Sequence, residues 1–432
     1  MTESDVKVVD RKFERIKMNK ENSVLRTVYI KKNKKGRSVI DPILTRVPDF
    51  NKFPNTDIKT PFKLQKAYNL PTVIPKDPSK RVKVGVLEPF YSDRCQQELD
   101  VYAQVHGLPP NQLIFHFWNE NAKYGDLDYI PRATETNHIS MCIQAIYSTN
   151  PYAEIHVFNV PDLRKIYTER ALEKAGELGV HMVTQSYGAW HNVKDKNPHH
   201  LEEILEKYPN MLNFAAVGNG GKIKDAIANP SATRHYLSIG CSHLYFDPND
   251  TNYRRLHEGA SPGSSHGPCG PITPKPEWQK KISVLDKYPN KHCPDFVAFG
   301  NGVSVFSIVP IWVPDPKFPE DEKKRIWIRD TYVWGRGGAT SQSSPIACGM
   351  LSLVNQALLN ADKPTLTLED LNKLFSDKEQ ASQCFYDITE IGQQPGWIPS
   401  IFRNLPHQGF DLVTGWGVPK IDQMISYFLN NK

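Results

Sequence analysis

Residues 337–350 read GGATSQSSPIACGM and join a glycine-rich turn to an apolar segment with helical spacing. Ser341 therefore lies near the predicted start of a helix, where free N–H groups and partial positive charge can stabilise an oxyanion. Pro345 agrees with this placement, because proline is tolerated in a first helical turn and not in a helix interior. A serine so placed is a candidate nucleophile, although an N-cap is the usual role of serine before a helix.

The same stretch resembles the nucleophile block of the subtilase superfamily, which reads Gly-Thr-Ser-x-Ala/Ser-Ser/Thr-Pro. Residues 340–345 match this block, and Ala339 stands where the family has glycine. That departure bears on the tightness of the turn and leaves the nucleophile in place. The following alanine and Gly349 resemble the sedolisin branch of the superfamily more than subtilisin itself.

Composition allows one large α/β unit. The chain has 432 residues, of which 39% are hydrophobic, so it can bury a sizeable core. Its net charge of +6 is spread thinly over this length, and we expect no nucleic-acid partner. The seven cysteines are scattered without metal-type spacing, which favours reduced thiols over a disulfide framework.

The N-terminal sequence gives no sign of export. Its first twenty residues contain no apolar core of a signal peptide, and no run of about 18 apolar residues occurs along the chain. We therefore expect no membrane span and a cytoplasmic or otherwise intracellular location.

Residues 1–59 are basic and differ from the rest. Apolar stretches at 24–30 and 38–44 flank the basic run KKNKKGR, which predicts two short strands around a solvated turn. A polyanion-binding role for this run is the alternative. The segment is either a short pro-region or a plain N-terminal extension, and residues 60–432 form the predicted peptidase domain.

From residue 60 the pattern alternates between strands and helices, which predicts βαβ units and a mostly parallel sheet. Residues 248–292 resemble a loop, and residues 313–334 a surface hairpin. Predicted strands lie at 82–87, 113–118, 154–160, 181–188, 213–221, 294–300 and 303–308, and predicted helices at 95–109, 136–148, 163–178, 199–207 and 366–377. With the resemblance above, the expected fold is a subtilisin-like three-layer αβα structure, with its site at the carboxyl ends of the strands.

Four further phrases resemble subtilase blocks and occur in the family's order. VGVLE resembles the strand that delivers the triad acid and ends at Glu88, where most subtilases have aspartate. TNHISMCIQAI resembles the helix of the catalytic histidine and contains His138. FAAVGNGG resembles the strand before the oxyanion donor and contains Gly218 and Asn219. HCPDFVAFG resembles a further phrase of the family.

QSYG completes the four phrases, with HCPDFVAFG additional to them, and resembles the strand that pairs with substrate backbone. It implies that Ser186, Tyr187 and Gly188 bind substrate, with Gly218 on the opposite wall.

The resemblance implies a role for each residue. His138 would take the proton of Ser341, and Glu88 would hold the imidazole tautomer. Asn219 would donate to the oxyanion, although Gly-Asn-Gly-Gly is also a strong turn signal. Sedolisins often carry a glutamate at this strand end with no catalytic role. The reserve candidates for the acid are Glu135, Asp93 and Asp128.

The chain departs from sedolisins in its chemistry. They place a glutamate and an aspartate four residues apart on this helix and use an aspartate as oxyanion donor. The corresponding positions here are His138, Cys142 and Asn219. The resemblance therefore implies a sedolisin-like frame with subtilisin-like chemistry.

The C-terminal block resembles the structural calcium site of sedolisins, built from an Asp-Ile pair and a Gly-x-Gly-x-Asp turn. Two carboxylates with carbonyls suit Ca²⁺, and the alternative is that both aspartates only cap turns. The residues implied as calcium ligands are Asp387, Ile388, His407, Gly409 and Asp411.

The function implied by these blocks is that of a serine endopeptidase that forms an acyl-enzyme at Ser341, with a peptide or protein as substrate. An inactive relative that binds peptides or a partner is the alternative. We expect a monomer.

Overall fold

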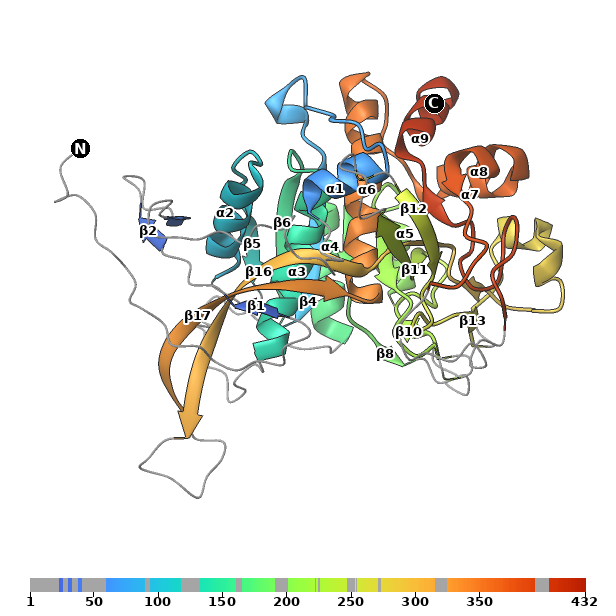
Figure 1. Cartoon of the computed structure of the whole chain (residues 1–432). Helices are drawn as coiled ribbons and strands as arrows, with labels where there is room; N and C mark the ends of the chain where they lie inside the picture. Colours follow the sequence, from blue (N-terminus) through green and yellow to red (C-terminus); the bar gives the residue numbers. More distant parts are fainter. Residues whose placement is uncertain are drawn as a thin grey trace.

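A central β-sheet covered by helices organises the chain, as Figure 1 shows for its computed structural model. The structure describes residues 23–25, 30–32, 38–40, 60–89, 94–117, 133–160, 165–190, 201–221, 223, 226–246, 253, 255–270, 273–314, 325–392 and 404–432.

The sheet has eight strands, and seven of them run parallel. Its order is β12-β11-β9-β7-β4-β6-β5, and β15 also pairs with β11; β12 alone is antiparallel. The strands are β4 Lys83–Pro89, β5 Ile114–Phe117, β6 Glu154–Val160, β7 Met182–Gln185, β9 Leu212–Ala216, β11 Tyr236–Phe246, β12 Arg255–Ala260 and β15 Phe296–Phe299.

Strand β4 marks the point where the chain changes its direction across the sheet. The chain passes from β4 to the edge strand β5, returns to β6 beside β4, and then continues on the other side of β4 with β7, β9 and β11. Binding sites of open α/β sheets form outside the carboxyl ends of the strands at such a switch point. Glu88, near the carboxyl end of β4, lies there, paired with Asn159 of β6.

Both faces of the sheet are covered, so the fold has three layers. Successive side chains of a strand point to opposite faces: Val84 and Val86 belong to the larger core cluster, and Leu87 belongs to a second cluster. Helices α2 Cys95–His106, α3 Ala133–Thr149, α6 Thr340–Asn360 and α9 Ile421–Asn431 belong to the first layer, and α4 Lys165–Glu177 and α5 Glu202–Lys207 to the second. The predicted αβα architecture is confirmed.

Helix α6 is buried over most of its length and packs closely on α3. Gly349 permits this approach, because a Cβ there would lie 2.1 Å from Thr149 Oγ1. Pro345 is the sixth residue of α6, so the prediction that it lies in the first turn is wrong. Proline has no N–H, and the carbonyl of Ser341, four residues earlier, therefore loses its helical donor. The Cys142 thiol lies 3.7 Å from this carbonyl and donates to it instead.

The region predicted as loop is partly regular. Strand β12 pairs with β11, and β13 Gly267–Pro268 pairs with β14 His292–Cys293. Short 3-10 helices occupy Glu277–Lys281 and Ser283–Leu285. The prediction of a loop over 248–292 is therefore wrong at these strands and short helices.

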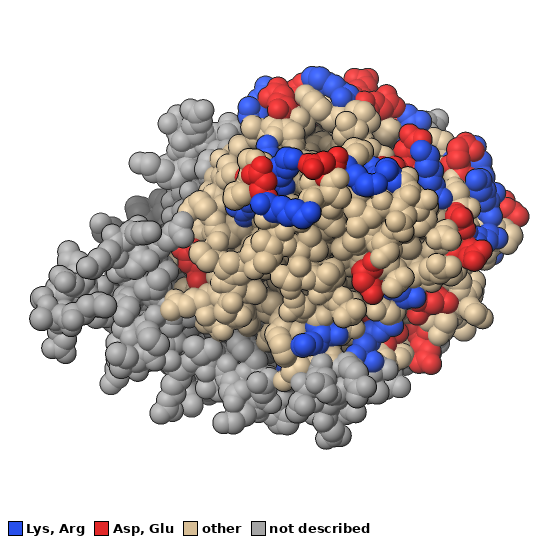
Figure 2. All heavy atoms as spheres, turned by 90° about the horizontal axis from the view of Figure 1, so that it is seen from above, with Lys and Arg blue, Asp and Glu red and all other residues tan. Residues whose placement is uncertain are grey.

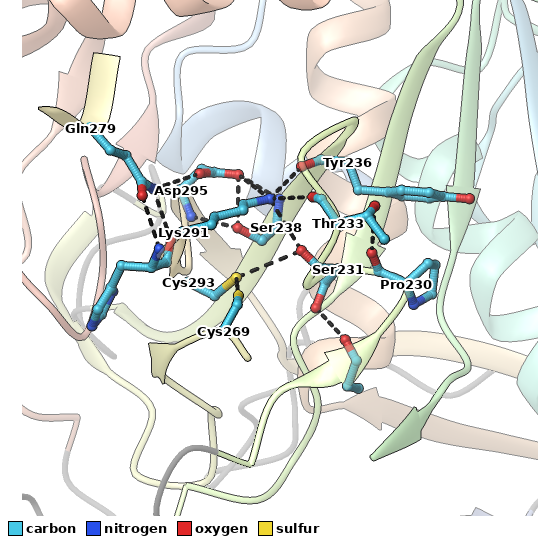
Figure 3. Close-up of polar contacts among 12 residues, drawn as sticks. Pro230, Ser231, Thr233, Tyr236, Ser238, Cys269, Gln279, Lys291, Cys293 and Asp295 are labelled. Carbon is cyan, nitrogen blue, oxygen red and sulfur yellow. Dashed lines mark hydrogen bonds and ion pairs between the residues drawn. The ribbon is translucent and has the colours of Figure 1, made fainter. Parts of the chain in front are cut away.

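A buried lysine holds this region against the end of β11 (Figure 3). Lys291 Nζ donates to the backbone carbonyls of Ser231, Thr233 and Tyr236 at 3.1, 2.8 and 2.7 Å. The carboxylate of Asp295 lies 3.6 Å from the same ammonium. Both charges are buried, so the pair and its carbonyl acceptors compensate each other's desolvation.

A long hairpin extends from the body of the molecule in Figure 1. Strands β16 Asn301–Pro314 and β17 Arg325–Gly338 pair antiparallel, so the hairpin begins earlier than the predicted residue 313. Proline is tolerated at a sheet edge, and β16, which contains Pro310, is an edge strand.

The N-terminal residues that the structure describes add to this picture. Strand β1 Ser23–Leu25 pairs with β17, and β2 Ile30–Lys32 pairs with β3 Ser38–Ile40. A hairpin is thus present as predicted, but its first strand is 30–32 and not the predicted 24–30. Within the ranges that the structure describes, no helix is long and apolar enough to cross a membrane.

Several short elements complete the described fold. Helix α1 Pro61–Ala67 precedes β4, with Thr60 as its N-cap. Helices α7 Leu368–Ser376 and α8 Lys378–Cys384 follow α6, and β18 Phe385–Tyr386 pairs with β19 Val418–Pro419. The two remaining short strands, β8 Ala189–Trp190 and β10 Ala228–Asn229, pair with each other.

Candidate active site

Ser341 is the second residue of α6 and follows a tight turn. Ala339 has φ 63° and ψ −170°, a conformation that glycine adopts readily and other residues rarely do. Its N–H donates to the Gly300 carbonyl at 2.6 Å, and a Cβ on Gly300 would lie 2.5 Å from the Ala339 carbonyl. Gly300 ends the phrase HCPDFVAFG, so this phrase supports the turn that presents Ser341.

Glu88 and His138 form a pair beside Ser341. Nδ1 of His138, on α3, lies 3.1 Å from Oε2 of Glu88, on β4. Glu88 is 1% exposed, whereas the side chain of His138 is 31% exposed and so reaches solvent. The Ser186 N–H donates to Oε1 of Glu88 at 3.1 Å and helps to hold the carboxylate. The structure thus places Glu88 where an acid could orient the imidazole.

The other candidate acids cannot be compared with Glu88. Asp93 and Asp128 lie outside the described residues, and Glu135 is on α3 but its side chain is not described.

Cys142 lies one helical turn after His138 and touches every group of the pair. Its sulfur is 3.4 Å from Oε1 of Glu88 and 4.0 Å from Nδ1 of His138. Burial raises the pKa of this thiol to about 11, with a further contribution from the Glu88 carboxylate. The neutral thiol is thus the favoured form, consistent with its donation to the Ser341 carbonyl.

Burial lowers the pKa of His138, but the Glu88 carboxylate, and after it Cys142, raise it more. The net pKa lies well above 6.5. From the sequence alone, the direction of this pKa shift could not be predicted. The buried Glu88 carboxylate, 3.1 Å away, makes the shift upward.

Asn219 lies at the N-terminus of α6. Its side-chain Oδ1 accepts from the N–H of Thr340 at 3.1 Å and from the Thr340 hydroxyl at 2.7 Å. Both bonds use the oxygen, so the amide NH₂ group points away from Thr340. The exposed amide therefore lies next to the nucleophile with a donor to spare.

The hydroxyl of Ser341 is bonded to a backbone carbonyl. This hydroxyl donates to the Ser186 carbonyl at 3.2 Å, and within the described residues no hydrogen bond joins it to His138. Catalytic hydrogen bonds are often long in unliganded sites and tighten when substrate binds. Rotation of the serine side chain away from Ser186 would be needed to reach the imidazole.

The predicted substrate-binding residues 186–188 follow β7 and begin at Ser186, whose carbonyl accepts from Ser341. Tyr187 packs into the second core cluster, with its hydroxyl 3.2 Å from that of Thr168. Gly188 runs against β10, since a Cβ there would lie 1.8 Å from the Asn229 carbonyl. Gly218 is half-exposed, has φ 99°, and accepts from the Ser265 N–H at 2.9 Å.

The predicted calcium residues lie in two adjoining segments. Oδ2 of the exposed Asp387 accepts from the Gly409 N–H at 2.8 Å. Asp411 is buried, and its carboxylate accepts from Val413 N–H, Thr414 N–H and the Thr414 hydroxyl. Asp411 thus caps its own turn, as the alternative prediction states.

The remaining two residues of this set flank those segments. Ile388 is buried directly after Asp387, and His407 is exposed, with Nδ1 3.1 Å from the Gln408 carbonyl. Carboxylate and carbonyl oxygens, the ligands that Ca²⁺ prefers, are present in both segments.

Comparison with solved structures identifies the fold. Pseudomonas sedolisin, a serine-carboxyl proteinase solved with pseudo-iodotyrostatin, superposes with a TM-score of 0.64 at 15% identity, over 87% of this chain and 98% of its own. A lanthipeptide protease gives a TM-score of 0.47 at 16% identity, over 85% of this chain and 93% of its own. No protein-family model matches the sequence, and no curated protein matches it.

The chain therefore shares its fold with Pseudomonas sedolisin, a serine-carboxyl proteinase. The sequence resemblance that predicted this fold is confirmed.

Proposed function

We propose that the protein is a serine endopeptidase that hydrolyses peptide bonds through an acyl-enzyme at Ser341. The observation that carries this proposal is a set of bonds that brings four separate segments together around Ser341, in a fold shared with sedolisin. Glu88 is bonded to His138, Cys142 links this pair to the Ser341 carbonyl, and Asn219 is bonded to the residue before Ser341.

In the acylation step the neutral imidazole of His138 removes the hydroxyl proton as Oγ of Ser341 attacks the peptide carbonyl. Glu88 holds Nδ1–H and stabilises the imidazolium. The tetrahedral intermediate then collapses, the C–N bond breaks, and His138 gives the proton to the leaving amine. Water repeats the sequence on the ester and releases the acid, which leaves the enzyme unchanged.

The oxyanion of the intermediate needs donors close to Ser341. The amide NH₂ of Asn219 and the backbone N–H of Ser341 are suited to this role, because first-turn N–H groups have no partner within the helix. The bonds from Thr340 to Oδ1 fix the orientation of the Asn219 amide. These bonds to the oxygen support the proposed use of the NH₂ group as a donor.

Turnover of peptides tests the proposal. The protein is incubated with a diverse peptide mixture, and cleavage products are identified by mass spectrometry alongside Ser341→Ala and His138→Ala. We expect internal cleavage that both variants lose. Equal cleavage by Ser341→Ala would refute the assignment, and no cleavage by any form would favour the peptide-binding alternative.

We further propose a structural calcium ion at the C-terminal block. Asp387, the carbonyl of Ile388, and the turn at 407–411 would hold it. The Gly409 N–H bond to Asp387 supports this, because it brings the two segments together. We also expect a monomer.

A further inference from the structure

The cleft also holds a set of three different metal-binding atoms. Glu88, His138 and Cys142 each present one ligand atom, and these atoms lie within 4.8 Å of one another. The measured separations are 3.1 Å for nitrogen to oxygen, 3.4 Å for sulfur to oxygen and 4.0 Å for sulfur to nitrogen.

These separations resemble the edges of a tetrahedral zinc site. Zinc bonds of about 2.3 Å to sulfur and about 2.0–2.1 Å to nitrogen and oxygen give edges of about 3.3 Å (N–O), 3.5 Å (S–O) and 3.5 Å (S–N). Two of the three measured separations agree with these edges, and the third needs a shift of about half an ångström of the Cys142 or His138 side chain.

We propose that Glu88, His138 and Cys142 form an inhibitory zinc site, whose fourth position opens to the cleft. Its inhibitory effect rests on the proposed peptidase function, whereas the binding of the metal does not. Mixed thiolate, imidazole and carboxylate donors suit zinc and not Mg²⁺ or Ca²⁺, which prefer oxygen.

The ligands are held by the fold. His138 and Cys142 are four residues apart on α3, so they lie on the same face of the helix. Glu88 comes from the central strand β4, and the Ser186 N–H fixes one of its oxygens. Cys142 has no part in the hydrolytic steps, and a metal ligand is a role that its position allows.

Zinc at this position would block the general base. A neutral imidazole has one free lone pair, and with zinc on Nδ1 the proton must reside on Nε2. Such a ring cannot accept the proton of Ser341. The thiol of Cys142 loses its proton on binding, as does His138 where it is charged, so zinc should bind more tightly as pH rises.

Binding is measured on Ser341→Ala, which cannot turn over substrate, by competition between the protein and a coloured zinc chelator. We expect one zinc ion per chain, and at least a tenfold loss of affinity when Cys142→Ala is added. Cys348→Ala is the matched control, because Cys348 is a buried cysteine of α6 away from this set. Cobalt(II) adds a spectroscopic test: a thiolate-to-cobalt absorption band should be lost with Cys142→Ala and kept with Cys348→Ala.

Inhibition is measured on the active protein with excess calcium present, so that zinc chelation leaves any calcium site filled. Zinc should lower turnover, a zinc chelator should restore it, and Cys142→Ala should resist zinc relative to its own metal-free rate. No binding, or equal binding by Cys142→Ala, would overturn the inference, as would bound zinc that leaves turnover unchanged. Absence of turnover without metal would instead refute the proposed function and leave the binding result standing.

Discussion

His138 is the residue whose surroundings say most about the proposed chemistry. Sedolisin-like carboxylates are replaced on α3 by an imidazole and a thiol, and the imidazole is bonded to a buried glutamate. The longer side chain of Glu88, where most subtilases have aspartate, reaches Nδ1 without disturbing β4. His138, in contact with Glu88, therefore favours a mechanism in which a neutral imidazole is the general base.

The pH profile follows from this pair. The base must be neutral, and the pKa of His138 lies well above 6.5 because the Glu88 and Cys142 contributions exceed the lowering by burial. We expect kcat/KM to be low near pH 4 and to rise with a midpoint above about 6.5. Glu88→Gln should move the midpoint down, since it removes the charge that raises this pKa. An acid maximum that survives His138→Ala would mean that carboxylates carry the reaction.

Asn219 should act on the transition state. Asn219→Ala should lower kcat by about 10²–10³, the loss known for the corresponding donor of subtilisin, with KM little changed. Asn219→Asp is the matched control, because it keeps an acceptor for Thr340 but loses the NH₂ donor. Both variants should lose kcat, and the aspartate should better preserve the melting temperature. A raised KM with constant kcat would place Asn219 in a substrate subsite instead.

At the scale of elements, the turn before α6 carries strain. Ala339 has φ 63° and ψ −170°, and a non-glycine residue in such a conformation costs about 1–3 kcal/mol. Ala339→Gly removes this strain. The glycine also gives the unfolded chain more conformational entropy, which lowers the free energy of unfolding by about 0.4–1 kcal/mol. We expect a net gain of about 1 kcal/mol, seen as a higher urea midpoint. Ala339→Val should lower the midpoint, and a destabilised glycine variant would show that the turn is relaxed in solution.

The predictions from sequence succeeded where local signals are strong. The strand that contains Glu88 and the helix that begins near Ser341 lie at the predicted positions. Both were predicted from the alternation of apolar strand segments with helical segments along the sequence. Strand β11 was missed because it is buried on both faces and pairs with β9, β12 and β15. A strand of this kind shows no alternation of polar and apolar residues.

The errors at Pro345 and over 248–292 have a different origin. Tertiary partners decide both: the Cys142 thiol satisfies the carbonyl that Pro345 leaves open, and Lys291 ties the proline-rich segment to three carbonyls. Such partners are distant in sequence. The bond from Ser186 N–H to Glu88 could not be predicted either, for the same reason.

At the scale of the whole molecule, the net charge does not predict a strongly charged binding partner. On the face seen in Figure 2, lysines and arginines alternate with aspartates and glutamates without a large field of one sign. This agrees with a thinly spread net charge of +6.

Calcium should stabilise the whole fold if the C-terminal block binds it. A ligand at a hundredfold excess over its Kd adds about 2.7 kcal/mol to the free energy of unfolding. The melting temperature should rise with Ca²⁺ and fall with chelator, and Asp387→Asn should remove the difference while keeping an acceptor for Gly409. Asp411→Ala is less informative, since Asp411 also caps its own turn. A melting curve that the chelator leaves unchanged would contradict the calcium site.

The central claim, that His138 activates Ser341 within a subtilase fold, is tested most directly by covalent labelling with a fluorophosphonate. This probe reacts with a serine only when its hydroxyl is activated. Intact mass after reaction at pH 8 should show one adduct per chain, and peptide mapping should place it on Ser341. Ser341→Ala should take no label, and His138→Ala should react far more slowly. An unlabelled chain, or labelling of Ser341 that is equally fast without His138, would contradict the account.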